Sequence, residues 1–229
     1  MIEGAPDSIG MAKAYYYRGK AYLDKHEDDR GIADLDAAIK LDPQLSIAFY
    51  ERGNAYMSEN RLDFALPDFV EALRQQPTNA AYHYNLGNAL LGGRQFDQAI
   101  DEYTEAIRLK PDFSLAYMNR GIANGQEGQF DKSIADLSAA VRLDPSNRES
   151  FFNRGIAYSV TGQFGLAVAD FDEAIRLDAT EPSAYSYRAR AYEKLGRSDD
   201  AIHDFRRALE LDPTDLQSQR ALRALGVER

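Results

Sequence analysis

Three histidines are the first residues of this 229-residue chain to consider for acid–base or metal chemistry. His26, His83 and His203 lie far apart at unrelated positions, so neither a metal-ligand spacing nor a Ser–His–Asp order can be argued from them. The chain has no cysteine, which excludes disulfides, thiolate metal sites and thiol nucleophiles. No glycine motif has the spacing of a phosphate-binding loop. We therefore expect no enzyme, no catalytic residue, no metal site and no cofactor.

Charged residues, in contrast, recur at a constant spacing of 34. Arginine holds one position with a single exception: Arg18, Arg52, Arg120, Arg154 and Arg188. Aspartate holds a second position with the same exception: Asp34, Asp68, Asp136, Asp170 and Asp204. Where both series break, Leu86 replaces the arginine and Glu102 replaces the aspartate. This joint change favours an ion pair between the two positions over solvated charges or a ligand site. An exposed pair of this kind contributes about 0–1 kcal/mol.

Small residues keep the same period of 34. Glycine recurs at Gly19, Gly53, Gly87, Gly121 and Gly155, and proline at Pro43, Pro77, Pro111, Pro145 and Pro213. Alanine recurs without exception at Ala38, Ala72, Ala106, Ala140, Ala174 and Ala208. Six units of this length fill residues 12–215, and such a period indicates a repeat protein. His83 takes a position that Tyr or Phe holds in the other units, so we expect it to be packed and hydrogen-bonded.

Each unit has the apolar pattern of two helices. In the third unit the apolar residues follow steps of three and four: Leu86, Ala89, Leu90, then Ala99, Ile100, Tyr103, Ala106 and Ile107. Glycines such as Gly128 mark the turn between the two helices. Aspartates are expected to cap the second helix: Asp29, Asp63, Asp97, Asp131 and Asp199. The proline near the end of most units then ends the second helix.

The residue order within the units resembles the tetratricopeptide repeat family. The fifth unit carries its pattern as Phe151, Arg154-Gly155, Tyr158, Ala167, Phe171 and Ala174. The resemblance implies an all-α fold, a right-handed α-α superhelix of helix-turn-helix repeats. We expect an N-terminal extension over residues 1–11 and a C-terminal capping helix over 216–229. Between them we expect six repeats: 12–45, 46–79, 80–113, 114–147, 148–181 and 182–215.

In this family the first helices line a concave groove, and here that resemblance places a nearly uncharged stripe in the groove. Acids and bases balance at the groove positions, whereas acids dominate the outward positions of the second helices. Asparagine recurs at two groove positions, as Asn54 and Asn88 and as Asn85, Asn119 and Asn153. Amides offer both donors and acceptors, so this series can bind the main chain of an extended peptide. Larger side chains flank it: Tyr50, Tyr84, Met118 and Phe152. These form side-chain pockets or, alternatively, only pack one repeat against the next.

The sequence therefore favours a non-catalytic protein–protein interaction scaffold that binds an extended, mostly uncharged peptide segment. One subtype of this family grips the C-terminal carboxylate of a chaperone tail with cations and asparagines spread over three repeats. Here the cation positions hold Tyr50, Leu115 and Asn119 or, in the other register, Tyr84, Glu149 and Asn153, so we expect no carboxylate clamp. A net charge of −10 argues against nucleic acid as a partner. The alternative is a self-assembling repeat protein that associates through its N-terminal end, where Tyr15, Tyr16 and Tyr17 surround the first helix.

The sequence also shows no pattern typical of a membrane-spanning helix or a secretory signal. No apolar run approaches the roughly 20 residues that a membrane-spanning helix needs, so we expect no membrane insertion. Residues 1–11 lack a basic start and an apolar stretch, so they do not form a secretory signal. We expect a cytoplasmic protein, or a periplasmic or exported one if a signal precedes this sequence.

Overall fold

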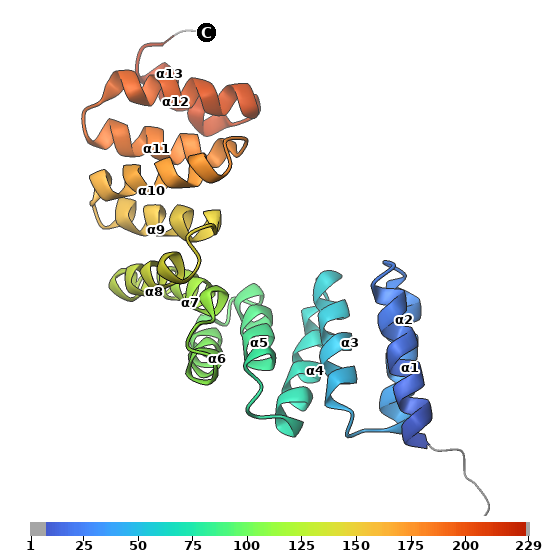
Figure 1. Ribbon diagram of the computed structural model, residues 1–229. Coiled ribbons are helices and arrows are strands. Elements are labelled where there is room, and N and C mark those ends of the chain that lie inside the picture. Colours follow the sequence, from blue (N-terminus) through green and yellow to red (C-terminus); the bar gives the residue numbers. More distant parts are fainter. Residues whose placement is uncertain (1–7, 228–229) are drawn as a thin grey trace, which may run out of the picture. The chain divides into compact units, whose positions relative to one another are not determined.

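The computed structural model describes residues 8–227, which form helices and connecting turns without a strand (Figure 1). The chain divides into two compact units, Met1–Pro111 and Asp112–Arg229, which we call unit 1 and unit 2. Each unit consists of successive antiparallel helix pairs. Within the described range, no helix is both long and apolar enough to cross a membrane.

Unit 1 contains three helix pairs, one for each of the first three repeats. The first helices are α1 (Ser8–Leu23), α3 (Ser46–Ser58) and α5 (Ala80–Gly92). The second helices are α2 (Asp28–Leu41), α4 (Leu62–Gln75) and α6 (Phe96–Leu109). Helix α1 begins within the stretch expected to be an extension, so that stretch is helical from Ser8 onward. The expected extension otherwise lies outside the described residues.

Unit 2 contains three further pairs and a last single helix. Its first helices are α7 (Ser114–Gln126), α9 (Arg148–Val160) and α11 (Pro182–Lys194). Its second helices are α8 (Phe130–Leu143), α10 (Phe164–Leu177) and α12 (Ser198–Leu211). Helix α13 (Leu216–Ala224) follows and packs on α12. Apart from α1, first helices and second helices each begin every 34 residues, as the sequence period predicts.

The turn inside each repeat requires a left-handed residue at one position. Gly128, Gly162 and Gly196 supply it with φ near +75°. His26, Asn60 and Arg94 hold the same position in the first three repeats, with φ between 57° and 59°. The expected aspartate caps of the second helices are wrong. These aspartates lie one residue inside the first turn, after N-cap residues that make no side-chain cap bond. There their charge faces the positive end of the helix dipole.

The recurring glycines lie where the two helices of a repeat approach most closely. A Cβ atom on Gly53, Gly87 or Gly155 would lie 2.7–2.9 Å from the aromatic ring of the second helix. A Cβ atom on Gly121 would lie 2.8 Å from Cγ of Leu137. The alanine series packs at the centre of each repeat, where all six members are fully buried. Small residues are therefore a packing requirement of the fold, since a larger side chain would separate the helices.

Replacing Gly121 with Leu should overpack this contact and lower the free energy of unfolding by about 1–3 kcal/mol. Urea denaturation of the full chain measures the change. Gly165→Ala is the matched control in the same unit, because no atom lies within 4 Å of its added Cβ. That change should stabilise α10 by up to about 1 kcal/mol. Equal stability of Gly121→Leu and the wild type would contradict the packing argument.

Candidate functional site

The charged residues of the repeats form structural ion pairs. All five expected pairs are present, each as a two-bond contact between a guanidinium and a carboxylate. In Arg154–Asp170, Nε lies 2.8 Å from Oδ2 and Nη2 lies 2.7 Å from Oδ1. The prediction drawn from the joint change in the third repeat is confirmed. These charges are paired with each other within the fold.

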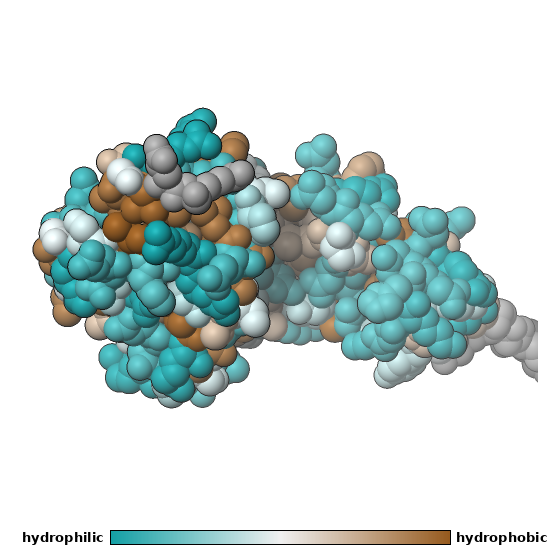
Figure 2. Space-filling view, turned by 90° about the horizontal axis from the view of Figure 1, so that it is seen from above, coloured by the Kyte–Doolittle hydropathy of each residue, from teal (hydrophilic) through white to brown (hydrophobic). Residues whose placement is uncertain are grey.

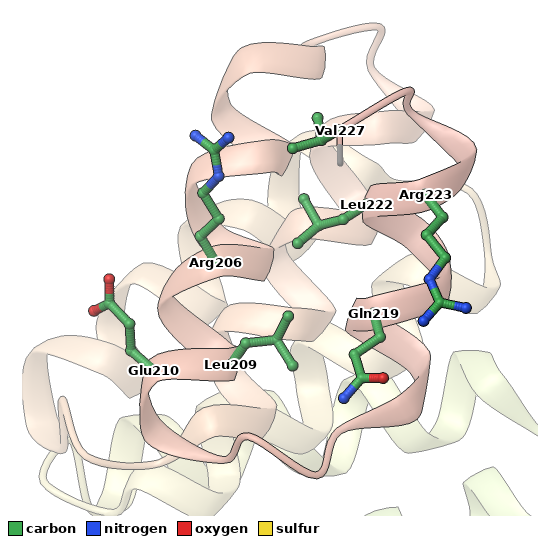
Figure 3. Close-up of a pocket in the computed structure, with 7 residues that line it drawn as sticks. All are labelled: Arg206, Leu209, Glu210, Gln219, Leu222, Arg223 and Val227. Carbon is green, nitrogen blue, oxygen red and sulfur yellow. The ribbon is translucent and has the colours of Figure 1, made fainter. Parts of the chain in front are cut away.

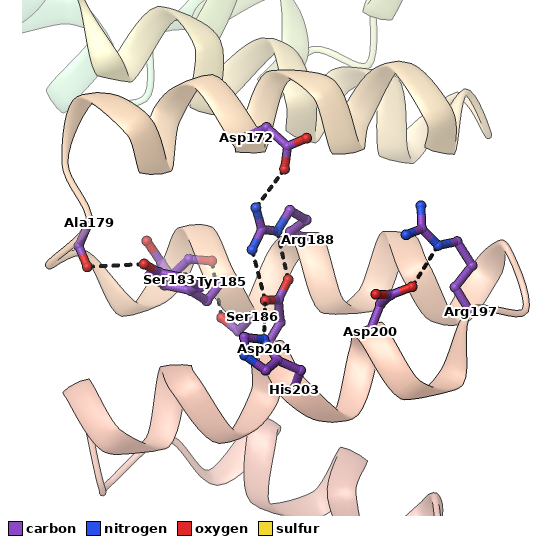
Figure 4. A network of polar contacts seen from close by, with 10 residues as sticks. All are labelled: Asp172, Ala179, Ser183, Tyr185, Ser186, Arg188, Arg197, Asp200, His203 and Asp204. Atoms are coloured by element: carbon purple, nitrogen blue, oxygen red, sulfur yellow. Dashed lines mark hydrogen bonds and ion pairs between the residues drawn. The ribbon is translucent and has the colours of Figure 1, made fainter.

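Several of these arginines also reach the second helix of the preceding repeat. Arg188 donates from Nη1 to Asp172 at 2.6 Å while it holds Asp204 with its other two nitrogens (Figure 4). Arg52 bridges Asp36 and Asp68 in the same way. One side chain thus joins three helices, which makes the guanidinium a link between consecutive repeats.

The third repeat replaces this link with a histidine. Nδ1 of His83 lies 2.7 Å from a carboxylate oxygen of Glu102, and Nε2 lies 3.0 Å from the carbonyl oxygen of Pro77. Both partners only accept, so the protonated ring satisfies both contacts. The hydrogen bond to Glu102 raises the pKa of His83, while burial opposes that rise. The predicted packed, hydrogen-bonded role is confirmed. Among the residues described, no cluster of His, Asp or Glu is arranged to hold a metal ion.

In unit 1, the asparagines predicted to bind a ligand form a connected network on the face built by α3 and α5. We call this the first-helix face. Nδ2 of Asn85 lies 2.8 Å from Oη of Tyr50 and 2.8 Å from Oδ1 of Asn54. Nδ2 of Asn88 lies 3.4 Å from Oδ1 of Asn85, and Tyr103 donates to Asn88 at 2.8 Å. The network therefore bridges adjacent repeats, a contact that spacing alone does not reveal.

The direction of these hydrogen bonds determines what the network offers to a ligand. Each donor in the series is used by the next residue, from Tyr103 through Asn88 and Asn85 to Asn54 and Tyr50. The amide NH₂ of Asn54 and the hydroxyl hydrogen of Tyr50 have no acceptor among the described residues. Both side chains are half-buried. The open end of the network thus presents hydrogen-bond donors.

The aromatic residues of this face also pack repeats together. The ring of Tyr50 stacks on Tyr82 of the next repeat, with centroids 4.5 Å apart. Tyr84 lies 6.0 Å from the ring of Tyr103. Packing is therefore one role of these side chains, between repeats for Tyr50 and within the third repeat for Tyr84. Because Tyr50 and Tyr84 keep part of their surface exposed, a role in ligand binding stays a prediction.

In unit 2, the four remaining predicted site residues are half-buried on α7 and α9: Met118, Asn119, Phe152 and Asn153. Phe152 packs edge-on against Tyr187 at 5.4 Å. Asn153 donates to the carbonyl oxygen of Glu149 in its own helix, which leaves its Oδ1 as an acceptor. The amide of Asn153 is therefore bonded within its own helix, unlike that of Asn85, which reaches the preceding repeat.

A cavity of about 700 Å³ at the α12–α13 end of unit 2 was not signalled by the sequence period (Figure 3). Leu209, Leu222 and Val227 form its apolar wall, and Arg206 and Arg223 stand on opposite sides. Helix α13 begins 34 residues after α11, so the cavity lies where a second helix would pack in a complete repeat. Apolar surface is visible at this end in Figure 2.

The fold and its contacts define a class, an all-α protein built from tandem helix pairs. Family models of the tetratricopeptide repeat match residues 12–45, 50–112, 84–148, 118–182 and 182–215. The chain belongs to the tetratricopeptide repeat family, and its fold is the expected all-α helical-repeat superhelix. Repeats of this family build protein–protein interaction scaffolds, and that is the general role of this chain.

Several solved structures share this fold at low sequence identity. PilF of Pseudomonas aeruginosa is 18% identical with a TM-score of 0.81, covering 96% of this chain and 100% of its own. PilW, described as a widely conserved type IV pilus biogenesis factor, is 20% identical with a TM-score of 0.81, covering 92% and 98%. YrrB, described as a TPR protein with an unusual peptide-binding site, is 20% identical with a TM-score of 0.70, covering 82% and 97%. No curated protein sequence matches the chain.

Removing one of the bridging arginines should be costly. Arg188→Leu leaves the carboxylate of Asp204, whose side chain is 2% exposed, without its charge partner. We expect a loss of about 3–5 kcal/mol in the free energy of unfolding, measured by urea denaturation. Arg176→Leu is the matched control, because that arginine forms an exposed pair with Glu173 and should cost no more than about 0.5 kcal/mol. Similar losses in both variants would contradict the bridging role.

The His83–Glu102 contact should make stability depend on pH. Because folding raises the pKa of His83, its contribution is complete below the unfolded value of about 6.5 and is lost as pH rises through the folded value. The test variant is His83→Phe, since phenylalanine holds this position in the second and fifth repeats. It should be less stable than the wild type at pH 6, and this difference in stability should shrink as the pH rises to 9. Thermal denaturation across this range measures the difference. A constant difference would show that folding does not change the pKa of His83, which would contradict this account.

Proposed function

We propose that the first-helix face binds an extended, mostly uncharged peptide segment of a partner protein without catalysing a reaction. The observation that carries this proposal is the open end of the asparagine network in unit 1. Asn54 and Tyr50 are half-buried and keep donors that no described residue uses, and a peptide carbonyl oxygen is the acceptor that every residue of an extended ligand supplies. The YrrB structure is an example of this fold with a peptide-binding site.

The internal hydrogen bonds favour this role because they fix the donors before a ligand arrives. Asn85 holds the carbonyl of Asn54 and the hydroxyl of Tyr50 together, each at 2.8 Å. A preorganised donor loses less conformational entropy on binding than a free side chain does. In unit 2, Asn153 offers an acceptor for a peptide N–H, and Asn119 is proposed to contribute at the equivalent position of its repeat. Met118 and Phe152 then contact ligand side chains.

Binding should not depend on charge. No carboxylate clamp is expected, and the arginines of the first helices are held by the aspartates of the second helices. Affinity therefore has to come from hydrogen bonds of about 0.5–1.5 kcal/mol each, together with apolar contact. Added salt should change such binding only weakly, since screening acts on charges.

Self-association through the N-terminal end is the alternative, and the exposure of α1 favours it. Tyr17 is 67% exposed, and Ile9 and Met11 are also exposed. Ala14 is exposed, although the equivalent residues of later repeats are buried beneath a preceding second helix. Tyr16, in contrast, packs against Leu35 within unit 1, so the three consecutive tyrosines do not act as one surface. Light scattering after size exclusion tests this alternative, because a monomer at all concentrations would eliminate it.

A double change, Tyr50→Phe with Asn54→Ala, tests the proposed peptide site. The phenylalanine keeps the stacking on Tyr82 and removes only the hydroxyl. Peptides are first enriched on the full chain from a random twelve-residue phage library, and their Kd is then measured by fluorescence anisotropy. Loss of both donors should weaken binding about tenfold or more.

Gln44→Ala is the control, because it removes an exposed amide in the α2–α3 turn, away from the first-helix face. It should bind the selected peptides as the wild type does. Unchanged affinity of the double variant would overturn the proposed site. Enrichment of strongly charged peptides alone would overturn the proposed ligand class.

A further inference from the structure

One repeat lacks the charged bridge that joins consecutive repeats elsewhere in the chain. In regular repeats an arginine of the first helix contacts an aspartate in its own second helix and a polar residue in the preceding one. Asp36–Arg52–Asp68, Ser138–Arg154–Asp170 and Asp172–Arg188–Asp204 follow this rule. At the corresponding positions of unit 1 stand Val70, Leu86 and Glu102. Two of the three bridging residues have become apolar together.

This apolar replacement coincides with a cavity in unit 1. The cavity measures about 380 Å³ and lies between α4 and α6, above α5. Its apolar part consists of Leu66, Val70, Leu86 and Leu90. We call it the back pocket, because the second helices form its sides. Val70, at the position of the bridging Asp36 and Asp172, is 55% exposed, whereas Leu86, at the position of the arginine, is buried.

The rim of the back pocket is acidic and amidic. Gln95, Gln98, Asp101 and Glu102 complete its lining, and no Lys or Arg of the described residues belongs to it. Glu102 is held by His83 at 2.7 Å. Asp101 is exposed and has no ion-pair partner in the described part of the chain. An apolar floor beside an unpaired carboxylate is complementary to an apolar side chain that carries a cation nearby.

We propose that the back pocket binds an amphipathic, basic helix of a partner protein. An apolar side chain of that helix, such as Leu or Phe, enters between Leu66, Val70 and Leu90. A Lys or Arg three or four residues away lies on the same side of the helix and reaches Asp101. The net charge of −10 adds long-range attraction for such a helix. This site is separate from the first-helix face and does not depend on it.

The double change V70D/L86R tests the proposal, because it restores the residue types of the other repeats and closes the pocket without creating a cavity. The probe is a synthetic fourteen-residue helical peptide with a Leu stripe flanked by Lys. Its partner probe carries Glu in place of every Lys. Binding is followed in 50 mM salt through the methyl resonances of Val70 and Leu86 in the wild type, and through fluorescence anisotropy for all variants.

We expect the Lys peptide to shift both methyl resonances and to bind at least tenfold more tightly than the Glu peptide. The V70D/L86R protein should bind it at least tenfold more weakly than the wild type. D101K should weaken binding similarly and needs no repacking, so it serves if the double variant does not fold. D131K, which changes an exposed aspartate of α8, is the matched control and should bind normally.

Four results would overturn the proposal. The first would be that the Lys peptide failed to bind at millimolar concentration. The second would be that it bound V70D/L86R and D101K as tightly as the wild type. The third would be that the Glu peptide bound as tightly as the Lys peptide. The fourth would be that neither peptide bound, while the wild type self-associated and V70D/L86R did not. The occupant of the back pocket would then be a second copy of the chain. The double change Tyr50→Phe with Asn54→Ala should leave the affinity for the Lys peptide unchanged. This result would distinguish the back pocket from the peptide site proposed on the first-helix face.

Discussion

The regular stacking of the repeats depends on one interaction, the contact of an arginine of a first helix with acidic residues of two second helices. The arginine directly precedes the small residue at the close helix contact, Gly53 or Ala189, and its guanidinium contacts carboxylates on two second helices. A buried carboxylate tolerates this position only with its partner present, because an unpaired buried charge is strongly destabilising. That requirement explains why arginine and aspartate change together, and only where a histidine supplies a different partner for the acid.

The same bridge shapes both surfaces of the repeats. It pairs the arginines of the first helices with aspartates of the second helices. The first-helix face keeps amides and aromatic rings, whose hydrogen bonds run between adjacent repeats without a charge. Where the bridge is missing, an apolar pocket with the exposed Val70 on its wall lies among the second helices. The two proposed binding surfaces therefore differ in kind. The first-helix face offers hydrogen-bond donors, whereas the back pocket is an apolar space at the place where the arginine bridge is missing.

Periodicity accounts for most of what the sequence predicted. The spacing of Gly, Ala and Pro gave the helix pairs, and the joint change at Leu86 and Glu102 gave the ion pairs, because both depend on contacts within one repeat. The start of α1 at Ser8 escaped prediction, since residues 8–11 lie before the first period. The contact of Asn85 with Tyr50 and Asn54 also escaped, because it depends on the rotation between adjacent repeats, which spacing does not specify. The outward face of Tyr17 and the inward face of Tyr16 follow from helix rotation in the same way.

The central claim is that the asparagine network holds donors ready for a peptide main chain. Titration of the ¹⁵N-labelled chain with a neutral peptide selected for binding tests it most directly, through the side-chain amide resonances of the asparagines. The account predicts that the NH₂ resonances of Asn54 move downfield on binding, as a new hydrogen bond forms, while those of Asn60 on the α3–α4 turn stay in place. Saturable binding that leaves the Asn54 amide unmoved would contradict the account.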